Sequence, residues 1–489
     1  MRYGASGISG RKQCRSELKT IWILLSVMLL TTFHSYAEAE NEMFRVALTG
    51  KYPPFSFYDE NGKLTGFDVD MSRAIAEELG KELEIVTTEW DGILAGLLTG
   101  KYDAIIGSMA ITEERKKKVS FSDPYYTSGA QVFIHKRDTS AVRGVDDLSG
   151  QPVGVVLGET FENYLRSNHP EVEVVTYKST VDIFQDMNNG RLKAFLTDRL
   201  VGMYQIKKAG KPFVPAGELL YREQMGIPVV KNDDVLRVGI NGSLSALRHK
   251  GTIDSLHAQW FRSSESSDTQ TGLTFFNVAK RLLKGFAVTV GVALISFLVG
   301  IFGAIPCGVV LNGPNNFFKT VLRAAIDFIR GTPVLIQLFF VYFGAPQIGI
   351  TLTPITSAII TLSINACAYM SEVVRSGLMA VDPGQKRAGK ALGLKRFDVF
   401  RFVIWPQAFR IAIPPLGNSA VALLKDTALI SVISVGEVVR EAQSIISITF
   451  NPMLYYVAIA ALFFIFTYPL MRFTASWERA LKQKGYMHD

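Results

Sequence analysis

The pattern of apolar and polar residues divides the chain into three parts. Residues 43–262 mix charged and apolar positions as a globular protein does, whereas long apolar runs alternate with short basic loops from 275 onward. A third part, residues 1–39, holds basic residues followed by the apolar run IWILLSVMLLTTF. That run is shorter than the roughly 20 residues that a bilayer requires. Because Ser35 and Ala37 follow this run at the small-residue positions of a cleavage site, the segment predicts a cleavable signal peptide. The alternative is an uncleaved anchor helix. In both cases the domain that follows is expected to be exported.

Residues 43–262 show the pattern of an α/β domain. An alternating strand is expected over 44–48, a hairpin turn at Asn61–Gly62, and an amphipathic helix over 68–79 that ends at Gly80. Similar strand and helix units recur further along, which predicts mostly parallel sheets.

Residues 275–489 predict an all-α membrane domain, joined to the first domain by the polar linker 263–274. A chain that starts outside and crosses five times ends inside, in agreement with the basic C-terminal tail. The five expected transmembrane helices cover 283–311, 322–345, 350–370, 411–435 and 453–472.

Charge and cysteine content narrow the class of protein. The net charge of +8 is concentrated in loops that flank apolar spans, so membrane topology explains it and a nucleic-acid partner is not required. Cys14 lies in the expected signal peptide, and Cys307 and Cys367 lie in apolar segments. The exported domain therefore has no cysteine for a disulfide framework and must be stabilised by its own core.

The sequence contains no convincing catalytic, metal or nucleotide site. The histidines of the exported domain stand in no constellation with a nucleophile, so neither a catalytic residue nor a metal ligand is predicted. The stretch GQKRAGKALG matches a phosphate-binding loop at Gly384, Gly389 and Lys390, but Ala391 has no hydroxyl to bind Mg²⁺. It also falls between two expected spans instead of inside an α/β domain, which excludes the nucleotide interpretation.

The exported domain resembles the periplasmic amino-acid-binding proteins of ABC importers. The resemblance rests on YPPFSF, GFDVDMSRAIAEELG, WDGILAGLLTGKYDAIIGSMAITEERKKKVSFSDPYY and VGVVLGET, in that order. It implies a two-lobed, Venus-flytrap fold whose lobes are joined near 133–137 and 226–231. The implied substrate-binding residues are Arg115 and Thr160 for the α-carboxylate, Asp198 and Ser108 for the α-ammonium, and Tyr52 and Trp90 as aromatic walls.

The first turn of that domain bears on the side chain of the ligand. Relatives that bind cationic amino acids often carry an acid there, but this chain has Thr49, Gly50 and Lys51. Lys51 favours an amide or acidic side chain, so glutamine or glutamate is the expected ligand.

Residues 276–489 resemble the permeases of amino-acid ABC importers. The resemblance rests on RGTPVLIQLFF, LLKDTALISVISVGE and an EAA-type coupling loop at about 371–410, in which Arg387 and Gly389 depart from the pattern. In this loop Asp382 is expected to cap a short basic helix over 384–392 that begins after Pro383. The resemblance assigns contact with a separate ATPase to Glu372, Gly377, Gln385, Lys386, Arg387, Ala388 and Gly393.

The combined interpretation is a receptor–permease component of an amino-acid importer, with no enzymatic activity of its own. ATP and Mg²⁺ would bind a separate ABC ATPase, so this chain needs no cofactor. It would form a homodimer among the lipids of the inner membrane, with its binding domain in the periplasm. The alternative is an amino-acid-gated channel of the glutamate-receptor type, but there the spans interrupt the ligand domain. Polar residues expected within or beside spans are candidates for the pathway or for helix contacts: Asp327, Asn365, Lys425 and Asp426.

Overall fold

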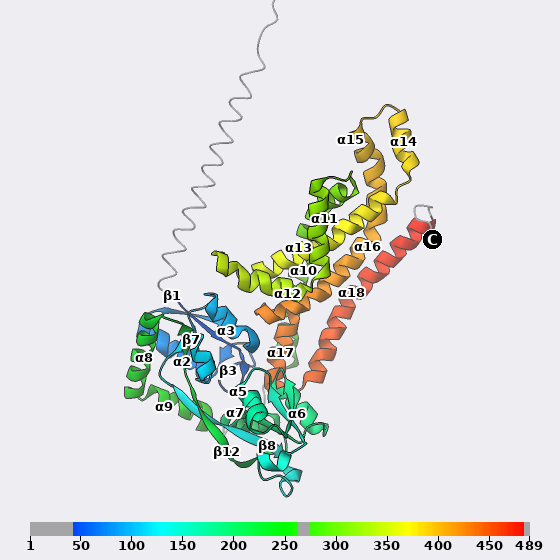
Figure 1. Ribbon diagram of the computed structural model, residues 1–489. Coiled ribbons are helices and arrows are strands. Elements are labelled where there is room, and N and C mark those ends of the chain that lie inside the picture. Colours follow the sequence, from blue (N-terminus) through cyan, green and yellow to red (C-terminus); the bar gives the residue numbers. More distant parts are fainter. Residues whose placement is uncertain (1–42, 263–273, 484–489) are drawn as a thin grey trace, which may run out of the picture.

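The computed structural model describes residues 43–262 and 274–483 and contains a two-lobed domain followed by a bundle of long helices (Figure 1). The expected signal peptide and nearly all of the expected linker lie outside the described residues.

Lobe 1 is built on a five-stranded sheet in the order β5-β1-β6-β13-β7. Strand β1 runs parallel to β5 and β6, while β13 runs antiparallel to β6 and β7. The strands are β1 Met43–Leu48, β5 Glu82–Thr87, β6 Ala104–Ile105, β7 Val119–Phe121 and β13 Pro228–Val230, with a small sheet of β2 Lys51–Tyr52, β3 Ser56–Tyr58 and β4 Leu64–Thr65. The helices are α2 Phe67–Leu79, α3 Trp90–Leu98, α4 Glu113–Lys116, α8 Asp234–His249 and α9 Thr252–His257, followed by the π-helical turn η3 Ala258–Arg262.

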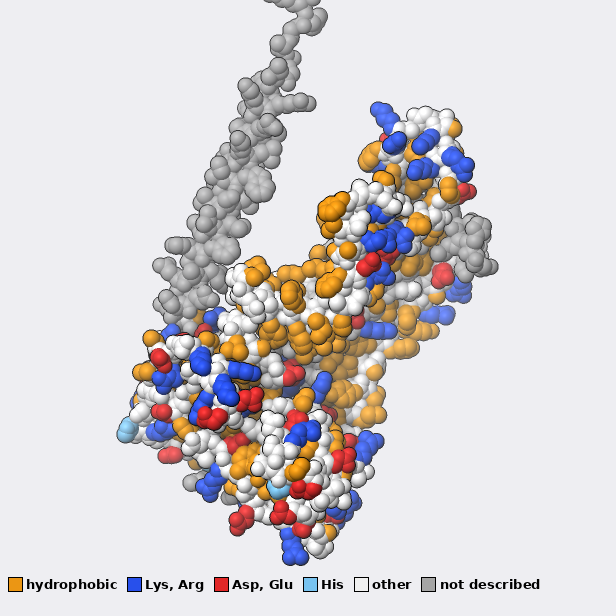
Figure 2. Space-filling model, viewed as in Figure 1, with side chains coloured by type: hydrophobic (Ala, Val, Ile, Leu, Met, Phe, Trp, Pro, Cys, Tyr) orange, Lys and Arg blue, Asp and Glu red, His pale blue; other side chains and the backbone are white. Residues whose placement is uncertain are grey.

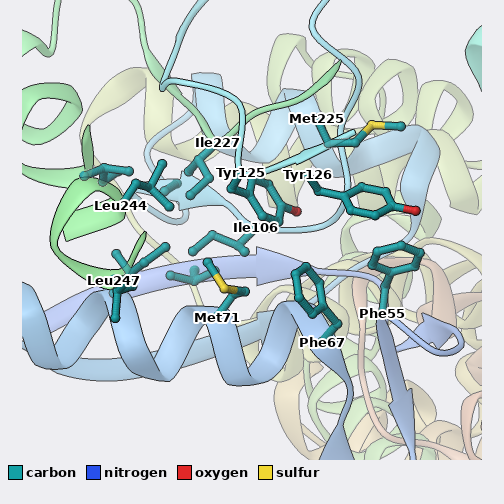
Figure 3. Packing of buried hydrophobic residues seen from close by; sticks show 14 of the residues in the cluster. Phe55, Phe67, Met71, Ile106, Tyr125, Tyr126, Met225, Ile227, Leu244 and Leu247 are labelled. Carbon is teal, nitrogen blue, oxygen red and sulfur yellow. The ribbon is translucent and has the colours of Figure 1, made fainter. Parts of the chain in front are cut away.

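The core of lobe 1 lies between α2, α8 and the sheet. Figure 3 shows Phe55 and Phe67 beside Tyr126, and Met71 facing Leu247 across this core. The apolar positions of α2 fall on one face, and its chain reverses at Gly80, whose φ of 65° suits a residue without a Cβ. The expected helix over 68–79 therefore occurs one residue longer, beginning at Phe67.

Lobe 2 has a second five-stranded sheet in the order β10-β9-β11-β8-β12. Strands β10, β9 and β11 are parallel, and β8 and β12 form a long antiparallel ribbon beside them. The elements are β8 Tyr126–His135, β9 Pro152–Val156, β10 Glu173–Tyr177, β11 Ala194–Asp198 and β12 Phe213–Met225, with α5 Thr160–Asn168, α6 Thr180–Asn188 and α7 Arg199–Ala209, and short turns η1 Lys136–Asp138 and η2 Val145–Leu148.

The chain passes between the lobes at two places. The first passage lies at residues 122–125, between β7 and β8, and the second at 226–227, between β12 and β13. The second falls within the expected range of 226–231. The first was predicted near 133–137, but those residues form the far end of β8 and the turn after it, because β8 continues for ten residues into lobe 2.

Within residues 274–483, the membrane domain contains four helices that are long and apolar enough to cross a bilayer, or five spans if one sharply bent pair is counted as a fifth. The four long segments cover Phe275–Asn312, Pro354–Met379, Arg396–Ile433 and Pro452–Leu481. The elements are α10 Phe275–Asn312, α11 Phe317–Gly331, α12 Val334–Phe339, η5 Phe340–Gly344, η6 Ala345–Ile348, α13 Pro354–Met379, α14 Pro383–Ala391, α15 Arg396–Asp398, η7 Val399–Ile404, α16 Trp405–Asp426, η8 Thr427–Ile433, α17 Val438–Thr449 and α18 Pro452–Gln483.

The second expected span is not straight. Helix α11 and the segment Val334–Ile348 meet at an angle of 105°, at a break next to Pro333. Gln337 stabilises this bend, because its Nε2 donates to the Ile329 carbonyl at 2.6 Å and its Oε1 accepts from Asn365 Nδ2 at 3.1 Å. Asn365 thus makes a helix contact, one of the two roles expected for it.

The two ends of the membrane domain have different surroundings. Helices α14 and α15 form a tip at the end far from the binding domain, and Lys and Arg side chains gather there (Figures 1 and 2). Helix α17 lies at the opposite end against lobe 2, where Phe450 stacks on Phe184 with ring centres 5.9 Å apart. One continuous apolar cluster therefore joins lobe 2 to α10, α17 and α18.

Candidate functional site

A cavity of about 210 Å³ lies between the two lobes and is bordered on a third side by the membrane domain. Lobe 1 contributes Tyr52, Trp90, Ser108 and Arg115 to its wall, and lobe 2 contributes Thr160. These are five of the six substrate-binding residues that the sequence predicts, brought together from positions more than 100 residues apart.

Arg115 is held in place by the start of a short helix. Thr112 caps α4 by accepting a hydrogen bond from the Arg115 amide at 3.2 Å, and Arg115 Nη1 donates to the Ala110 carbonyl at 3.0 Å. The guanidinium lies 5.7 Å from the centre of the Trp90 ring, a cation–π distance. Because a guanidinium has five N–H donors, this arrangement leaves donors for a ligand carboxylate.

The two aromatic residues border the cavity in different ways. Tyr52 stacks on Phe55 with ring centres 5.8 Å apart, which fixes its ring to the core of lobe 1. Trp90 is the first residue of α3, and its Nε1 donates to the Gly158 carbonyl of lobe 2 at 3.3 Å. Trp90 therefore bridges the lobes as well as bordering the cavity.

Ser108 is positioned by a buried network that the sequence analysis missed. Its Oγ donates to Asp68 Oδ2 at 3.0 Å, and its amide donates to the Tyr125 hydroxyl at 2.9 Å, while that hydroxyl donates to Asp68 Oδ1 at 2.7 Å. Ser108 has a φ of 51°, a strained value for a non-glycine residue. Burial raises the pKa of Asp68 to about 7. The sequence feature that could have revealed this network is an acidic residue, Asp68, on the apolar face of the expected helix in the stretch GFDVDM.

Asp198 lies behind the cavity and not on its wall. It is the last residue of β11, and its Oδ1 caps α7 by accepting from the amides of Leu200 at 2.8 Å and Val201 at 3.2 Å. The side chain is only 2% exposed, and burial raises its pKa to about 6. The structure therefore does not place this carboxylate among the groups that line the cavity.

Four acidic residues that the sequence analysis did not single out line the cavity: Glu89, Glu159, Asp182 and Glu223. Glu159 precedes α5, and Glu223 lies near the end of β12. Burial, with Asp198 and Glu223 nearby, raises the pKa of Glu159 to about 8, and burial also raises the pKa of Glu223. Glu159 stands in the quoted stretch VGVVLGET, but a residue before a helix gives no sign of which way its side chain turns.

Helix α17 of the membrane domain contacts lobe 1 at the edge of the cavity. Lys51 Nζ lies 2.5 Å from Glu89 Oε1 and 2.6 Å from Gln443 Oε1. Arg440 Nη1 contacts the same Glu89 oxygen at 2.9 Å, and its side chain is 5% exposed. Gln443, Ile446 and other α17 residues also line the cavity. The membrane domain thus forms part of the wall, a relationship between distant segments that sequence spacing does not reveal.

The tip of the membrane domain has the local structure expected for the coupling loop. Asp382 Oδ1 accepts from the Gly384 amide at 2.7 Å, Pro383 begins α14, and the chain reverses at Gly393 with a φ of 77°. Helix α14 exposes a row of polar and basic side chains: Gln385, Lys386, Arg387 and Lys390, with Ala388 beside them.

Two glycines and an acid of the coupling loop, Gly377, Gly389 and Glu372, make contacts within the membrane domain. A Cβ on Gly377 would lie 2.8 Å from the Ala408 carbonyl oxygen, so this glycine permits α13 and α16 to approach closely. A Cβ on Gly389 would lie 3.0 Å from the Val399 side chain, which accounts for glycine at this departure from the family pattern. Glu372 pairs with Arg375 of its own helix at 2.7 Å.

Comparisons with known proteins match both domains separately. Residues 44–263 match the bacterial extracellular solute-binding proteins, family 3, and residues 300–483 match the binding-protein-dependent transport system inner membrane component. Among the described residues, the binding domain precedes all of the candidate spans, and nothing in these matches supports a ligand-gated channel.

Individual relatives agree with these assignments. The chain is 38% identical over 216 residues to the L-cystine-binding protein TcyJ of Escherichia coli (strain K12), covering 44% of this chain and 81% of that protein. It is 32% identical over 243 residues to ABC transporter arginine-binding protein 1 of the same strain, and this match covers 49% of this chain and 98% of that protein. It is 33% identical over 203 residues to the glutamine transport system permease protein GlnP of that strain, and this match covers 41% of this chain and 93% of that protein.

The chain therefore belongs to the family 3 bacterial extracellular solute-binding proteins through its first domain and to the inner-membrane components of binding-protein-dependent transport systems through its second, a fusion of the binding and permease components of an amino-acid ABC transporter.

Proposed function

We propose that this chain captures a polar amino acid in the cavity between its lobes and delivers it across the inner membrane through its own permease domain, driven by a separate ABC ATPase. The observation that carries the proposal is the shared cavity. Its wall combines Arg115, an arginine suited to a carboxylate, with α17 of the membrane domain. A ligand released from this cavity is already in contact with the permease.

Both ends of a zwitterion have complementary groups in the site. The ligand carboxylate binds Arg115, assisted by Thr160 at the N-terminus of α5. The ammonium binds the Ser108 hydroxyl and an acidic group of lobe 2. Asp198 reaches the ammonium only if cleft closure brings its carboxylate to the wall, whereas Glu223 of lobe 2 already lines the cavity. Tyr52 and Trp90 cover the aliphatic part of the ligand.

The preference for glutamine or glutamate rested on Lys51, and the structure gives that residue another role. Its ammonium is held between Glu89 and Gln443, so it is not free to pair with an acidic ligand side chain. The relatives are named for cystine, arginine and glutamine, so they do not select one ligand. The side chain of the ligand must be inferred from the wall of the cavity itself.

Delivery requires two further partners. The exposed basic face of α14 is suited to a groove on an ATPase subunit, and it stands at the end of the molecule opposite to the binding domain (Figure 2). Many apolar side chains of α10 and α18 face outward, which fits contact with lipid and with a second copy of the chain. We propose a homodimer with two ATPase subunits, ATP and Mg²⁺ being bound by those subunits.

Equilibrium binding of labelled amino acids to the full-length chain in lipid nanodiscs tests the receptor function. The wild-type chain is expected to bind at least one polar amino acid. Arg115→Ala is expected to weaken that binding about 100-fold, because a charge-assisted bidentate contact contributes about 3 kcal/mol. Lys116→Ala removes the neighbouring cation, which pairs with exposed Glu113, and is expected to change nothing. Equal binding by the Arg115→Ala chain would contradict the proposed site.

A further inference from the structure

The side chain of Glu159 does not cap the helix that it precedes. Glu159 is the N-cap residue of α5, yet its side chain accepts no hydrogen bond from that helix. The N-cap side chains of Thr112, Ser179 and Asp198 in the same domain all accept one. The Glu159 carboxylate instead borders the cavity between the lobes.

An oxygen of this carboxylate is buried without a hydrogen-bond partner. Among the residues that the structure describes, Glu159 Oε2 has no donor. Gln205 shows the same feature, because its Nε2 donates to the Pro53 carbonyl at 3.2 Å while its buried Oε1 has no partner. Both residues line the cavity. Buried acceptors without donors are costly, so these two oxygens indicate that a ligand supplies N–H groups here.

The charges around the cavity point to the kind of donor. Lys51 and Glu89 neutralise each other as an ion pair. The rest of the lining has two cations, Arg115 and the exposed Lys178, and three acids, Glu159, Asp182 and Glu223, with Asp198 buried behind them. An ordinary zwitterion adds no net charge and leaves this acidic excess uncompensated. A second positive charge on the ligand compensates it, and uncompensated buried charge is strongly unfavourable.

We propose that the ligand is an α-amino acid that carries a second cationic nitrogen, an ammonium or a guanidinium, and that Glu159 with Gln205 selects it by contacting that nitrogen. This inference rests on the proposed function and specifies its substrate class. A carboxylate side chain such as that of glutamate adds a further negative charge and no donor. An amide such as that of glutamine supplies donors but no positive charge to stabilise the ionised form of Glu159.

Competition binding to the full-length chain in nanodiscs tests this inference with four ligands: arginine, lysine, glutamine and glutamate. We expect arginine or lysine to bind at least about tenfold more tightly than glutamine, because pairing a buried charge is worth more than one decade in affinity. The stronger of the two distinguishes a guanidinium from a side-chain ammonium as the source of the charge.

Glu159→Gln should remove the preference and Glu162→Gln should not. The Glu159→Gln substitution keeps the shape and removes the charge, so the cationic ligand should lose at least about tenfold in affinity while glutamine changes little. Glu162 lies on the same helix, pairs with Arg166 at 3.1 Å and does not line the cavity, so it serves as a matched control. A thermal unfolding midpoint equal to wild type verifies that each variant is folded.

Two results separate failure of this inference from failure of the proposed function. If glutamine or glutamate binds most tightly, or if Glu159→Gln leaves the selectivity unchanged, the assignment of a cationic ligand is wrong and the receptor function stands. If the folded wild-type chain binds none of the twenty amino acids, the proposed function itself is wrong.

Discussion

Arg440 on α17 and Glu89 before α3 form an ion pair of 2.9 Å that joins the membrane domain to the binding domain. The same Glu89 oxygen accepts from Lys51, the residue before Tyr52, and Glu89 itself precedes Trp90. The contact between the two domains is therefore one residue away from each aromatic wall of the cavity. A change in the position of lobe 1 must displace this pair, so opening of the cleft and contact with α17 are mechanically linked.

Charge reversal at this pair tests the docked arrangement. Arg440→Glu places two like charges together, so α17 should detach and the hydrogen–deuterium exchange of residues 438–449 should rise at least about tenfold. The double variant Arg440→Glu with Glu89→Gln removes the like-charge contact and leaves Lys51 as a partner for the new carboxylate, so it should restore slow exchange. Unchanged exchange in the single variant would show that the ion pair does not hold the domains together.

The Asp68 network should support ligand affinity indirectly. Asp68→Asn removes the charged acceptor of both Ser108 and Tyr125, so Ser108 loses its fixed position and amino-acid affinity should fall about tenfold. Glu77→Gln alters an exposed acid on the same helix and should leave affinity unchanged. Calorimetric titration of the full chain gives both values. Wild-type affinity in Asp68→Asn would exclude a positioning role.

Asp68 should also make the free energy of unfolding depend on pH. Burial raises the pKa of Asp68 from 3.8 to about 7, so the folded chain binds a proton that the unfolded chain has released between these values. The free energy of unfolding should therefore fall as the pH rises from about 4 to about 7 and level off above that. Chemical denaturation of the binding domain within the full chain should show a shallower decline in Asp68→Asn. An equal slope in both proteins would contradict the assignment.

Ligand affinity should also depend on pH through Glu159, whose pKa is raised to about 8 mainly by burial. A cationic ligand favours the ionised carboxylate, so binding releases a proton and tightens as the pH rises toward 8. Between about pH 7 and 8 the affinity should increase by up to about tenfold, because one pH unit corresponds to one decade at most for a single group. In Glu159→Gln this increase should disappear, and its persistence would assign the effect to Asp198 or Glu223.

Gly377 should not tolerate replacement by a residue with a side chain, because α13 and α16 approach closely at this position. A Cβ there would lie 2.8 Å from the Ala408 carbonyl, so Gly377→Ala should destabilise the membrane domain by about 1–3 kcal/mol. Gly291→Ala is the matched control, since a Cβ on this α10 glycine meets no atom within 4 Å and alanine favours helix. Thermal unfolding in detergent compares the two. A wild-type midpoint for Gly377→Ala would indicate that the helices separate easily.

The basic face of α14 should be required for coupling but not for binding. Lys386→Glu with Arg387→Glu reverses two exposed charges, which should abolish ligand-stimulated ATP hydrolysis by the associated ATPase and leave amino-acid affinity intact. Lys63→Glu reverses an exposed charge on the binding domain and should not affect hydrolysis. Full stimulation in the α14 variant would show that the ATPase contacts another surface.

The sequence predicted the architecture well where local patterns carry the information. Strand 44–48, helix 68–79 and the capped helix after Asp382 follow from periodicity and from cap residues, and all occur in the structure. The bend in the second expected span was not predicted, because it involves a long-range contact between Gln337 and Asn365 in addition to Pro333. The first lobe crossing was misplaced because a strand gives no local sign of the lobe to which it belongs.

The site was predicted less completely for the same reason. Family motifs led to five of the residues that line the cavity, but motifs do not show that Asp198 turns toward α7 or that Glu159 turns toward the cavity. The role of Lys51 depended on Gln443, which lies 392 residues further along the chain. Such orientations and distant contacts are set by packing, and only the structure reveals them.

The most direct measurement is uptake of a labelled amino acid by proteoliposomes that contain the full-length chain and its co-purifying ABC ATPase. With the ligand on the side of the binding domain and ATP on the side of α14, we expect accumulation against a gradient, abolished by Arg115→Ala and by omission of ATP. Accumulation in Arg115→Ala equal to wild type, or a downhill flux that needs no ATP, would contradict a receptor fused to its own permease.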